Sequence, residues 1–304
     1  MLYNKQNFAA LTGGVDTADV APVITVDVVS NLVANLDTFR KLLGVTDMRA
    51  VAEGSQLKLY KTTLTSLANQ VDENQTIALT EVKRVLAKTI DISLKKYRKL
   101  VSAEAIQQSG LDAAVNDTDA KLVSEIQKDI KGGFFTALTT GATAATAGAD
   151  LQAACANAWG ALSAKFEDID ATPVFFINPL DAAAYLGAAT VTMQTAFGIS
   201  YLENFLGLGT AIITASVTAG TVVATASENI RGAFVPANGA VGNAFGLYSD
   251  ATGLVGMTHT AKTDSASIET MCLSGVAFYP EDVSGVFTAA ISSGETTESE
   301  SDGE

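Results

Sequence analysis

The sequence has little of what most active sites are built from. It contains one histidine, His259, and two cysteines, Cys155 and Cys272, in 304 residues. A single histidine cannot form a metal-binding pair, and two cysteines in a chain of this length cannot form a disulfide framework. The cysteine content is typical of a reducing compartment, and we expect both thiols to be buried apolar side chains.

Motifs that carry chemistry are also missing. No serine lies in a G-x-S-x-G context, no G-x-x-x-x-G-K-[ST] occurs, and the G-L-G at 207–209 has no third glycine. The acidic pairs at 72–73 and 281–282 lie in polar segments and are expected to be solvated turns. We therefore predict no catalytic, cofactor-binding or metal-binding residues, no cofactor and no enzymatic activity.

The sequence also has no hydrophobic run typical of a membrane span. The N-terminus has no basic region followed by an apolar stretch, so no secretory signal is predicted. Residues 207–226 carry no charge, but Thr, Gly, Ala and Ser dominate them instead of Leu, Ile and Phe. We interpret this segment as two strands joined by a turn at Ala219-Gly220, and we predict no contact with a membrane.

Positive charge is scarce in the C-terminal part. Up to Lys131 the chain has 16 basic and 16 acidic residues, whereas after Lys131 it has 3 basic and 17 acidic residues. The whole net charge of −14 therefore lies after Lys131. Binding to nucleic-acid phosphates needs clustered Lys and Arg, so this part is excluded as a nucleic-acid reader.

What the sequence does contain is a large apolar content and three helix patterns. Hydrophobic residues make up 48% of the chain, enough for one large domain or two lobes. After an extended arm of about 30 residues, apolar spacing predicts a helix over 29–43 that stops at Gly44. A second helix is predicted over 117–138 with Asp117 as its N-cap. The third begins after Asp150.

Between the first two helices the pattern is extended. Residues 54–94 predict a long two-stranded hairpin with a polar tip at 68–75. Seven of the chain's 19 positive charges lie in the basic run 81–99. This run is a strip for nucleic acid, an arm that docks on an acidic surface of a neighbouring copy, or a solvated strand face. Poor interleaving with aromatic residues disfavours the first of these.

The C-terminal part predicts an α/β unit followed by strands. The small-residue stretch 139–148 is interpreted as a linker. Asp150 then caps a helix, 173–177 is a strand buried on both faces, and Asn178-Pro179 starts a short helix that ends at Gly187. The expected apolar stripe of the Asp150-capped helix consists of Leu151, Ala154, Cys155, Ala158, Trp159 and Leu162. The further extended candidates are 211–215, 222–226, 234–235, 244–248, 253–257 and 265–279.

In this order, the segments resemble the major capsid proteins of tailed phages, whose fold is shared with encapsulins and the herpesvirus capsid floor. The resemblance rests on the hairpin, the helix 117–138, the segment 173–186 (PVFFINPLDAAAYL), residues 209–230 and 271–280 (MCLSGVAFYP). It implies an α+β fold with an N-arm, an E-loop hairpin, a spine helix, a peripheral domain and an α/β axial domain.

The resemblance also implies a domain division. Its parts are an N-terminal arm with a short helix (1–53), the E-loop (54–94), the peripheral domain with the spine helix (95–149 and 231–293), the axial domain (150–230) and a disordered acidic tail (294–304). Some members of the family cross-link a lysine to an asparagine. Lys58 and Lys61 lie in the hairpin, but no matching asparagine and acid are identified, so this activity is not transferred.

The function that the resemblance implies is that of a structural subunit of an icosahedral phage head. The subunits would form hexamers and pentamers around double-stranded DNA contacted without sequence specificity, with a portal protein and possibly a separate scaffolding protein as partners. The protein would be located in the virion, which would be assembled in the cytoplasm of the bacterial host. Two alternatives stay open: the shell of an encapsulin-like cellular compartment, and a small-molecule enzyme on the α/β lobe.

Overall fold

The computed structural model describes residues 17–46, 48–66, 73–76, 79, 81–167, 170–187, 193–196 and 199–292. The predicted tail at 294–304 and most of the hairpin tip at 68–75 lie outside these residues. The helices are α1 (Thr17–Leu42), α2 (Ala103–Ser109), α3 (Leu111–Thr139), α4 (Leu151–Lys165), α5 (Pro179–Leu186) and α6 (Gly239–Phe245), with short 3₁₀ turns at η1 (Ser227–Asn229) and η2 (Val283–Gly285).

The first of two large sheets runs beneath the long helices. Its strand order is β1-β11-β14-β13-β12, and β4 also pairs with β14. Its strands are β1 (Met48–Ala50), β4 (Lys95–Ser102), β11 (Ile230–Val235), β12 (Tyr248–Ser249), β13 (Val255–Lys262) and β14 (Ser267–Pro280). The 14-residue strand β14 is the central strand of this sheet. It pairs antiparallel with β11 along one half of its length and lies between β13 and β4 along the other half.

The second sheet has the order β5-β15-β10-β6-β9-β8-β7. Its strands are β5 (Thr143–Ala144), β6 (Pro173–Ile177), β7 (Gln194–Ala196), β8 (Ile199–Phe205), β9 (Gly209–Ile213), β10 (Thr221–Ala226) and β15 (Val286–Ala290). Helix α4 packs on β10 and β15. Strand β6 is buried on both faces, as predicted, because Val174, Phe175, Phe176 and Ile177 are all inaccessible to solvent.

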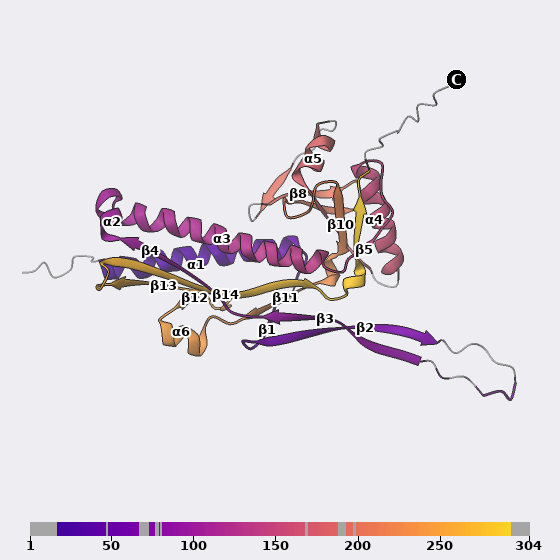
Figure 1. Ribbon diagram of the computed structural model, residues 1–304, viewed down its shortest axis with the longest axis horizontal. Coiled ribbons are helices and arrows are strands. Elements are labelled where there is room, and N and C mark those ends of the chain that lie inside the picture. The colour runs from indigo at the N-terminus through magenta and orange to yellow at the C-terminus, as the bar shows by residue number, and fades with distance from the viewer. Residues whose placement is uncertain are drawn as a thin grey trace, which may run out of the picture.

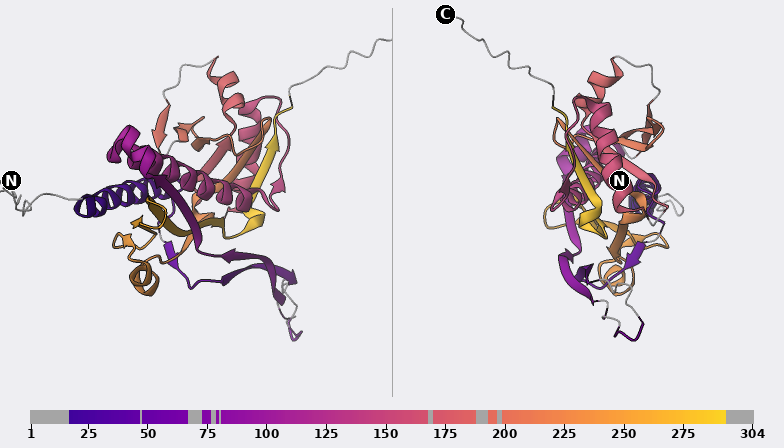
Figure 2. Two further views of the ribbon diagram at one scale, coloured as in Figure 1. Left: turned by 60° about the vertical axis from the view of Figure 1, so that its left-hand side comes forward. Right: turned by 90° about the vertical axis from the view of Figure 1, so that its right-hand side faces the viewer.

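A separate two-stranded sheet forms the predicted hairpin. Strands β2 (Ser55–Ser66) and β3 (Glu81–Ile92) pair antiparallel from Ser55 opposite Ile92 to Ser66 opposite Glu81. Figures 1 and 2 show α1 and α3 on one side of the first sheet and the hairpin extending from the other side. Only the base of the hairpin contacts this sheet, through β11 and β14.

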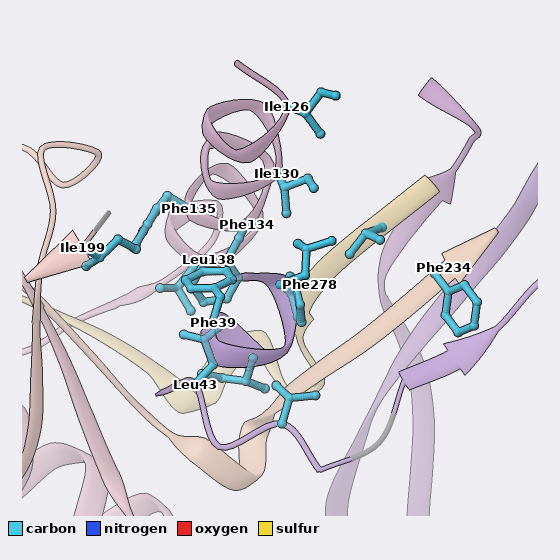
Figure 3. Packing of buried hydrophobic residues seen from close by; sticks show 14 of the residues in the cluster. Phe39, Leu43, Ile126, Ile130, Phe134, Phe135, Leu138, Ile199, Phe234 and Phe278 are labelled. Atoms are coloured by element: carbon cyan, nitrogen blue, oxygen red, sulfur yellow. The ribbon is translucent and has the colours of Figure 1, made fainter. Parts of the chain in front are cut away.

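The main hydrophobic core joins α1, α3 and both large sheets. Phe134 of α3 lies at its centre, and its ring meets Phe39 of α1 at a centroid distance of 6.1 Å, Phe176 of β6 at 5.7 Å and Phe278 of β14 at 6.4 Å. All three pairs are edge-to-face, the arrangement that aromatic rings prefer. Figure 3 shows Phe39, Phe134 and Phe278 close together where α1, α3 and β14 meet.

The N-terminal helix is longer than the sequence predicts. We expected an extended arm up to about residue 30, but α1 already begins at Thr17. The expectation rested on the polar, glycine-bearing composition of the first residues and on their lack of a sustained apolar periodicity. Helix α1 nevertheless continues through the β-branched run Val23-Ile24-Thr25-Val26, which favours extended structure by propensity. The C-terminal half of α1 corresponds to the helix predicted over 29–43, and it buries Val29, Leu32, Leu36 and Phe39.

The long central helix is confirmed, but its predicted start is wrong. Helix α3 begins at Leu111, so Asp117 lies within it and is not its N-cap. The turn before it uses Gly110, whose φ of 83° is readily adopted by glycine and separates α2 from α3. Leu122, Ile126, Ile130, Phe134 and Leu138 face the core as the four-residue spacing predicted, with Leu122 only partly buried.

Two caps in the C-terminal part match the predictions. The Asp150 carboxylate accepts a hydrogen bond from the Ala153 N–H at 2.7 Å, and the Asn178 Oδ1 accepts one from the Leu180 N–H at 2.9 Å. The prediction for Trp159 was wrong: the predicted apolar stripe of α4 included this residue, but its side chain is 40% exposed. The interpretation of 139–148 as a linker also needs correction, because residues 143–144 form β5 and pair with β15.

Two strand predictions also need correction. The strands expected at 211–215 and 222–226 exist as β9 and β10, but they are not neighbours, since β6 lies between them. Residues 244–248 were expected to be extended, whereas α6 continues through Phe245 and ends at Gly246, which has a φ of 59°. Neither the sheet order nor this short helix has a local sequence pattern that distinguishes it from the alternative.

Candidate functional site

His259, the only histidine, is held by a buried carboxylate. It lies on β13, and its Nε2 is 2.8 Å from Asp119 Oδ2 on α3. The other oxygen of Asp119, Oδ1, lies 2.7 Å from Lys99 Nζ on β4. The Asp119 side chain is fully buried and that of His259 is almost so. His259, Asp119 and Lys99 thus tie a strand, the long helix and a second strand together, and we call them the buried ion cluster.

The electrostatics of the cluster favour a charged Asp119. Burial by itself would raise the pKa of this carboxyl, but hydrogen bonds from His259 and Lys99 outweigh burial and hold the pKa below its usual range. The Lys99 ammonium also donates to the Val115 carbonyl at 3.0 Å and to Thr118 Oγ1. The cluster is therefore a paired, hydrogen-bonded structural element.

Asp119 was not among the residues predicted from the sequence. A signal was present: Asp119 shares the face of α3 that carries Leu122, Val123 and Ile126, so an acid stands on the apolar stripe. A buried acid requires a cationic partner. However, the partners are 20 residues before it and 140 residues after it, and only the fold brings them together.

Other candidate groups have structural partners as well. Glu281 binds Arg231, with Oε2 and Nε 2.7 Å apart. Asp282 caps η2 by accepting the Ser284 N–H at 2.9 Å, and it lies 3.4 Å from Lys165. The pair at 281–282 is therefore engaged in local structure beyond a solvated turn. Among the described residues, no group of three or more His, Cys, Asp or Glu side chains could hold a metal ion.

Both cysteines are buried, as predicted, and this has a measurable consequence. Burial raises the pKa of the Cys155 thiol to about 12 and that of the Cys272 thiol to about 12. Because the thiolate is the reactive form, the native protein should not react with a disulfide reagent such as DTNB at pH 8. In 6 M guanidinium we expect both thiols to react. Reaction of either thiol in the native state, at the rate of a free thiol, would contradict this burial.

The basic run divides into two parts that differ in their partners. Lys95 is paired with Asp129 at 2.7 Å, Arg98 with Glu269 at 2.6 Å, and Lys99 with the buried ion cluster, so these β4 cations are neutralised within the chain. On β3, Lys88 donates to the Ala137 carbonyl at 2.9 Å, and Arg84 stacks on the Tyr60 ring at 4.2 Å. Lys83, also on β3, is paired with Glu81 at 3.0 Å. Several cations of the run are thus paired with acids within the chain.

The hairpin exposes apolar side chains along β3. Val82 is 57% exposed, Val85 55% and Leu86 48%. Because side chains alternate along a strand, Val82 and Leu86 share one face and Val85 points to the other. An isolated two-stranded hairpin with apolar side chains on both faces is marginal in water and is a site for association.

No helix among the described residues is long and apolar enough to cross a membrane. Residues 207–226, tested above as a span, form β9 and β10.

No family model and no curated protein matches the sequence. Among solved structures, the fold is that of capsid-type shell proteins. The virus-like particle from Pyrococcus furiosus matches with a TM-score of 0.51 and 12% identity, over 87% of this chain and 98% of that chain. The Gordonia phage Cozz structure matches with a TM-score of 0.49, 12% identity, and coverage of 83% and 86%. For Mycobacterium phage Che8 the values are 0.46, 14%, 78% and 85%.

The mixed α+β capsid fold predicted from the resemblance is therefore confirmed. At 12% identity the match extends to the fold alone.

Proposed function

We propose that this chain is a structural subunit that self-assembles into a closed shell, and that the shell is the icosahedral head of a tailed phage enclosing double-stranded DNA. The observation that carries the proposal is the shared fold with a particle-forming chain. In this proposal the hairpin 54–94 is the E-loop, α3 is the spine helix, 150–230 is the axial domain, and 95–149 with 231–293 is the peripheral domain. Hexamers, pentamers, a portal and a scaffolding protein belong to the same proposal.

The geometry supports assembly through the hairpin. Strands β2 and β3 pair only with each other, and β3 leaves three large apolar side chains exposed. Contact with a neighbouring copy would bury this surface, at about 1.5–3 kcal/mol for each large side chain. The shell would repeat that gain at every copy.

A second candidate is the shell of an encapsulin-like cellular compartment. The observation that favours it is the match to a virus-like particle at a TM-score above 0.5. Electron microscopy of the purified particles tests the shared part of both proposals, and uniform closed shells are expected. Nuclease-protected double-stranded DNA inside them would support the phage head, and protected protein cargo without DNA would support the compartment. A monomer under all conditions would contradict both.

The hairpin's role can be tested by removing its exposed apolar side chains. We expect the triple variant Val82→Ser, Val85→Ser, Leu86→Ser to keep its fold, because exposed substitutions change the free energy of unfolding by about 0.5 kcal/mol or less each. Shell assembly should be lost at concentrations where the unaltered chain assembles. Light scattering and sedimentation measure this.

Leu100→Ser is the matched control, since Leu100 is also half exposed but lies on β4, outside the hairpin. It should assemble normally. Normal shells from the triple variant would rule out the hairpin as an assembly contact.

A further inference from the structure

A concave pocket of about 440 Å³ lies at the base of the hairpin, where the hairpin passes β1, β11 and the end of β14. Figure 1 shows these strands meeting there. Strands far apart in the sequence supply the walls, so the pocket depends on the fold. Its polar lining consists of Arg49, Lys58, Tyr60, Arg84, Arg231, Tyr279 and Glu281.

The pocket carries more positive than negative charge. Four of these side chains are cations and one is an anion, Glu281, whose carboxylate is already bound by Arg231 at 2.7 Å. Among the residues that the structure describes, neither Arg49 nor Lys58 forms an ion pair with a carboxylate. Arg84 is fixed over the Tyr60 ring at 4.2 Å. The pocket thus presents more cationic donors than carboxylate acceptors.

The floor of the pocket contributes a neutral donor. Tyr279 is buried, and burial raises its pKa while Arg49 and Arg231 act in the opposite direction. The phenol keeps its proton at neutral pH and faces the same cations. Several cationic donors and a hydroxyl around one cavity suit an anion with more than one oxygen, because guanidinium groups bind such anions through paired hydrogen bonds.

We propose that this pocket binds carboxylate side chains of the acidic segment 294–304 of a neighbouring copy. That segment, GETTESESDGE, has five acidic residues and no basic one. The cations converge in a small concavity, whereas a DNA duplex is followed by cations spread along an extended surface. A carboxylate segment therefore fits the pocket better than a duplex.

The direction of the chain makes a neighbouring copy the partner. From Glu281, β15 carries the chain along the second sheet away from the hairpin (Figure 1), and the last described residue is Ser292. A segment that left from there would have to reverse to reach its own pocket. The inference rests on the proposed function, since it names a contact between subunits of the shell.

Cross-linking of full-length copies tests the contact. Equal amounts of unlabelled and ¹⁵N-labelled chain are assembled together and treated with a carbodiimide, which joins a lysine amine to a carboxylate. We expect mass spectrometry to find Lys58 joined to segment 294–304 in peptides that combine one labelled and one unlabelled part. Lys121, an exposed lysine on α3, is the control and should not join that segment.

A double-mutant cycle between the pocket cations and the acids of 294–304, measured by the strength of self-association, gives a second test. Arg49→Ala with Lys58→Ala should weaken self-association by about tenfold or more, as expected when close charge pairs at an interface are lost. Replacing the acids of 294–304 by Gln or Asn should do the same, and combining both sets should add little. Lys121→Ala with Lys128→Ala, two exposed lysines of α3, is the matched control and should have no effect.

Three results would overturn the inference. They are cross-links only within one copy, no cross-link from Lys58 to 294–304, or loss of affinity for a double-stranded oligonucleotide as the sole effect of Arg49→Ala with Lys58→Ala. Shells that form without the cross-link would remove this inference and leave the proposed function standing. A chain that never associates would remove both.

Discussion

Replacing Asp119 by alanine should lower the free energy of unfolding by about 3–5 kcal/mol, the range measured when one partner of a buried ion pair is removed. Asp119 is fully buried between Lys99 Nζ at 2.7 Å and His259 Nε2 at 2.8 Å. Without its carboxylate, the Lys99 ammonium, 14% exposed, would lack its anionic partner. Alanine would also leave a cavity at the junction of β4, α3 and β13.

Urea unfolding followed by circular dichroism measures this effect. Because assembly would add its own stabilisation, the comparison is best made in the background of the triple hairpin variant. Asp117→Ala is the matched control: the same substitution two positions away on the same helix, at an exposed side chain. It should change the free energy of unfolding by about 0.5 kcal/mol or less. Equal losses for Asp117→Ala and Asp119→Ala would contradict the buried ion cluster.

The same cluster predicts a pH dependence of known sign. The pKa of Asp119 in the folded chain lies below its usual value. Its contribution to stability is therefore present above the unfolded-state pKa of about 3.9 and is lost as the pH falls through the lower folded-state pKa. The difference in free energy of unfolding between the unaltered chain and Asp119→Ala should shrink as the pH falls through that acidic interval.

The sequence predicted those features that depend on neighbouring residues. The caps at Asp150 and Asn178, the core stripe of α3 and the hairpin each follow from the spacing of a few adjacent side chains. It failed where distant segments decide the outcome. Strand β6 separates β9 from β10, and α1 extends through a β-branched run.

The same distinction between neighbouring and distant residues applies to the candidate site. His259 lies on β13, but its partner Asp119 is 140 residues away in the sequence. The basic run 81–99 looked continuous in sequence, whereas Lys95, Arg98 and Lys99 are neutralised by acids from α3 and β14. Arg84 of the same run instead lines the pocket at the hairpin's base, together with Arg49 from β1 and Arg231 from β11. No local pattern indicated that combination.

Phe134→Ala should have an effect of similar size to Asp119→Ala, for a different reason. Phe134 is fully buried and packs edge-to-face on Phe39, Phe176 and Phe278, which come from α1 and from both large sheets. Truncating a buried phenylalanine to alanine costs about 3–5 kcal/mol, because transfer energy is lost and a cavity remains. The value should lie near the upper end, since these three aromatic pairs and a fourth, with the neighbouring Phe135, are lost together.

Two matched variants test whether the loss depends on the burial of Phe134 and on the side-chain volume removed there. Phe245→Ala removes the same side chain from α6, where it is 57% exposed, and should change the free energy of unfolding by about 0.5 kcal/mol or less. Phe134→Leu keeps most of the volume and should cost clearly less than Phe134→Ala. Since Phe134 joins the elements of both sheets, its loss should shift the unfolding of the whole chain as one transition. If one part unfolded early while the rest kept its midpoint, the two sheets would not share a cooperative core.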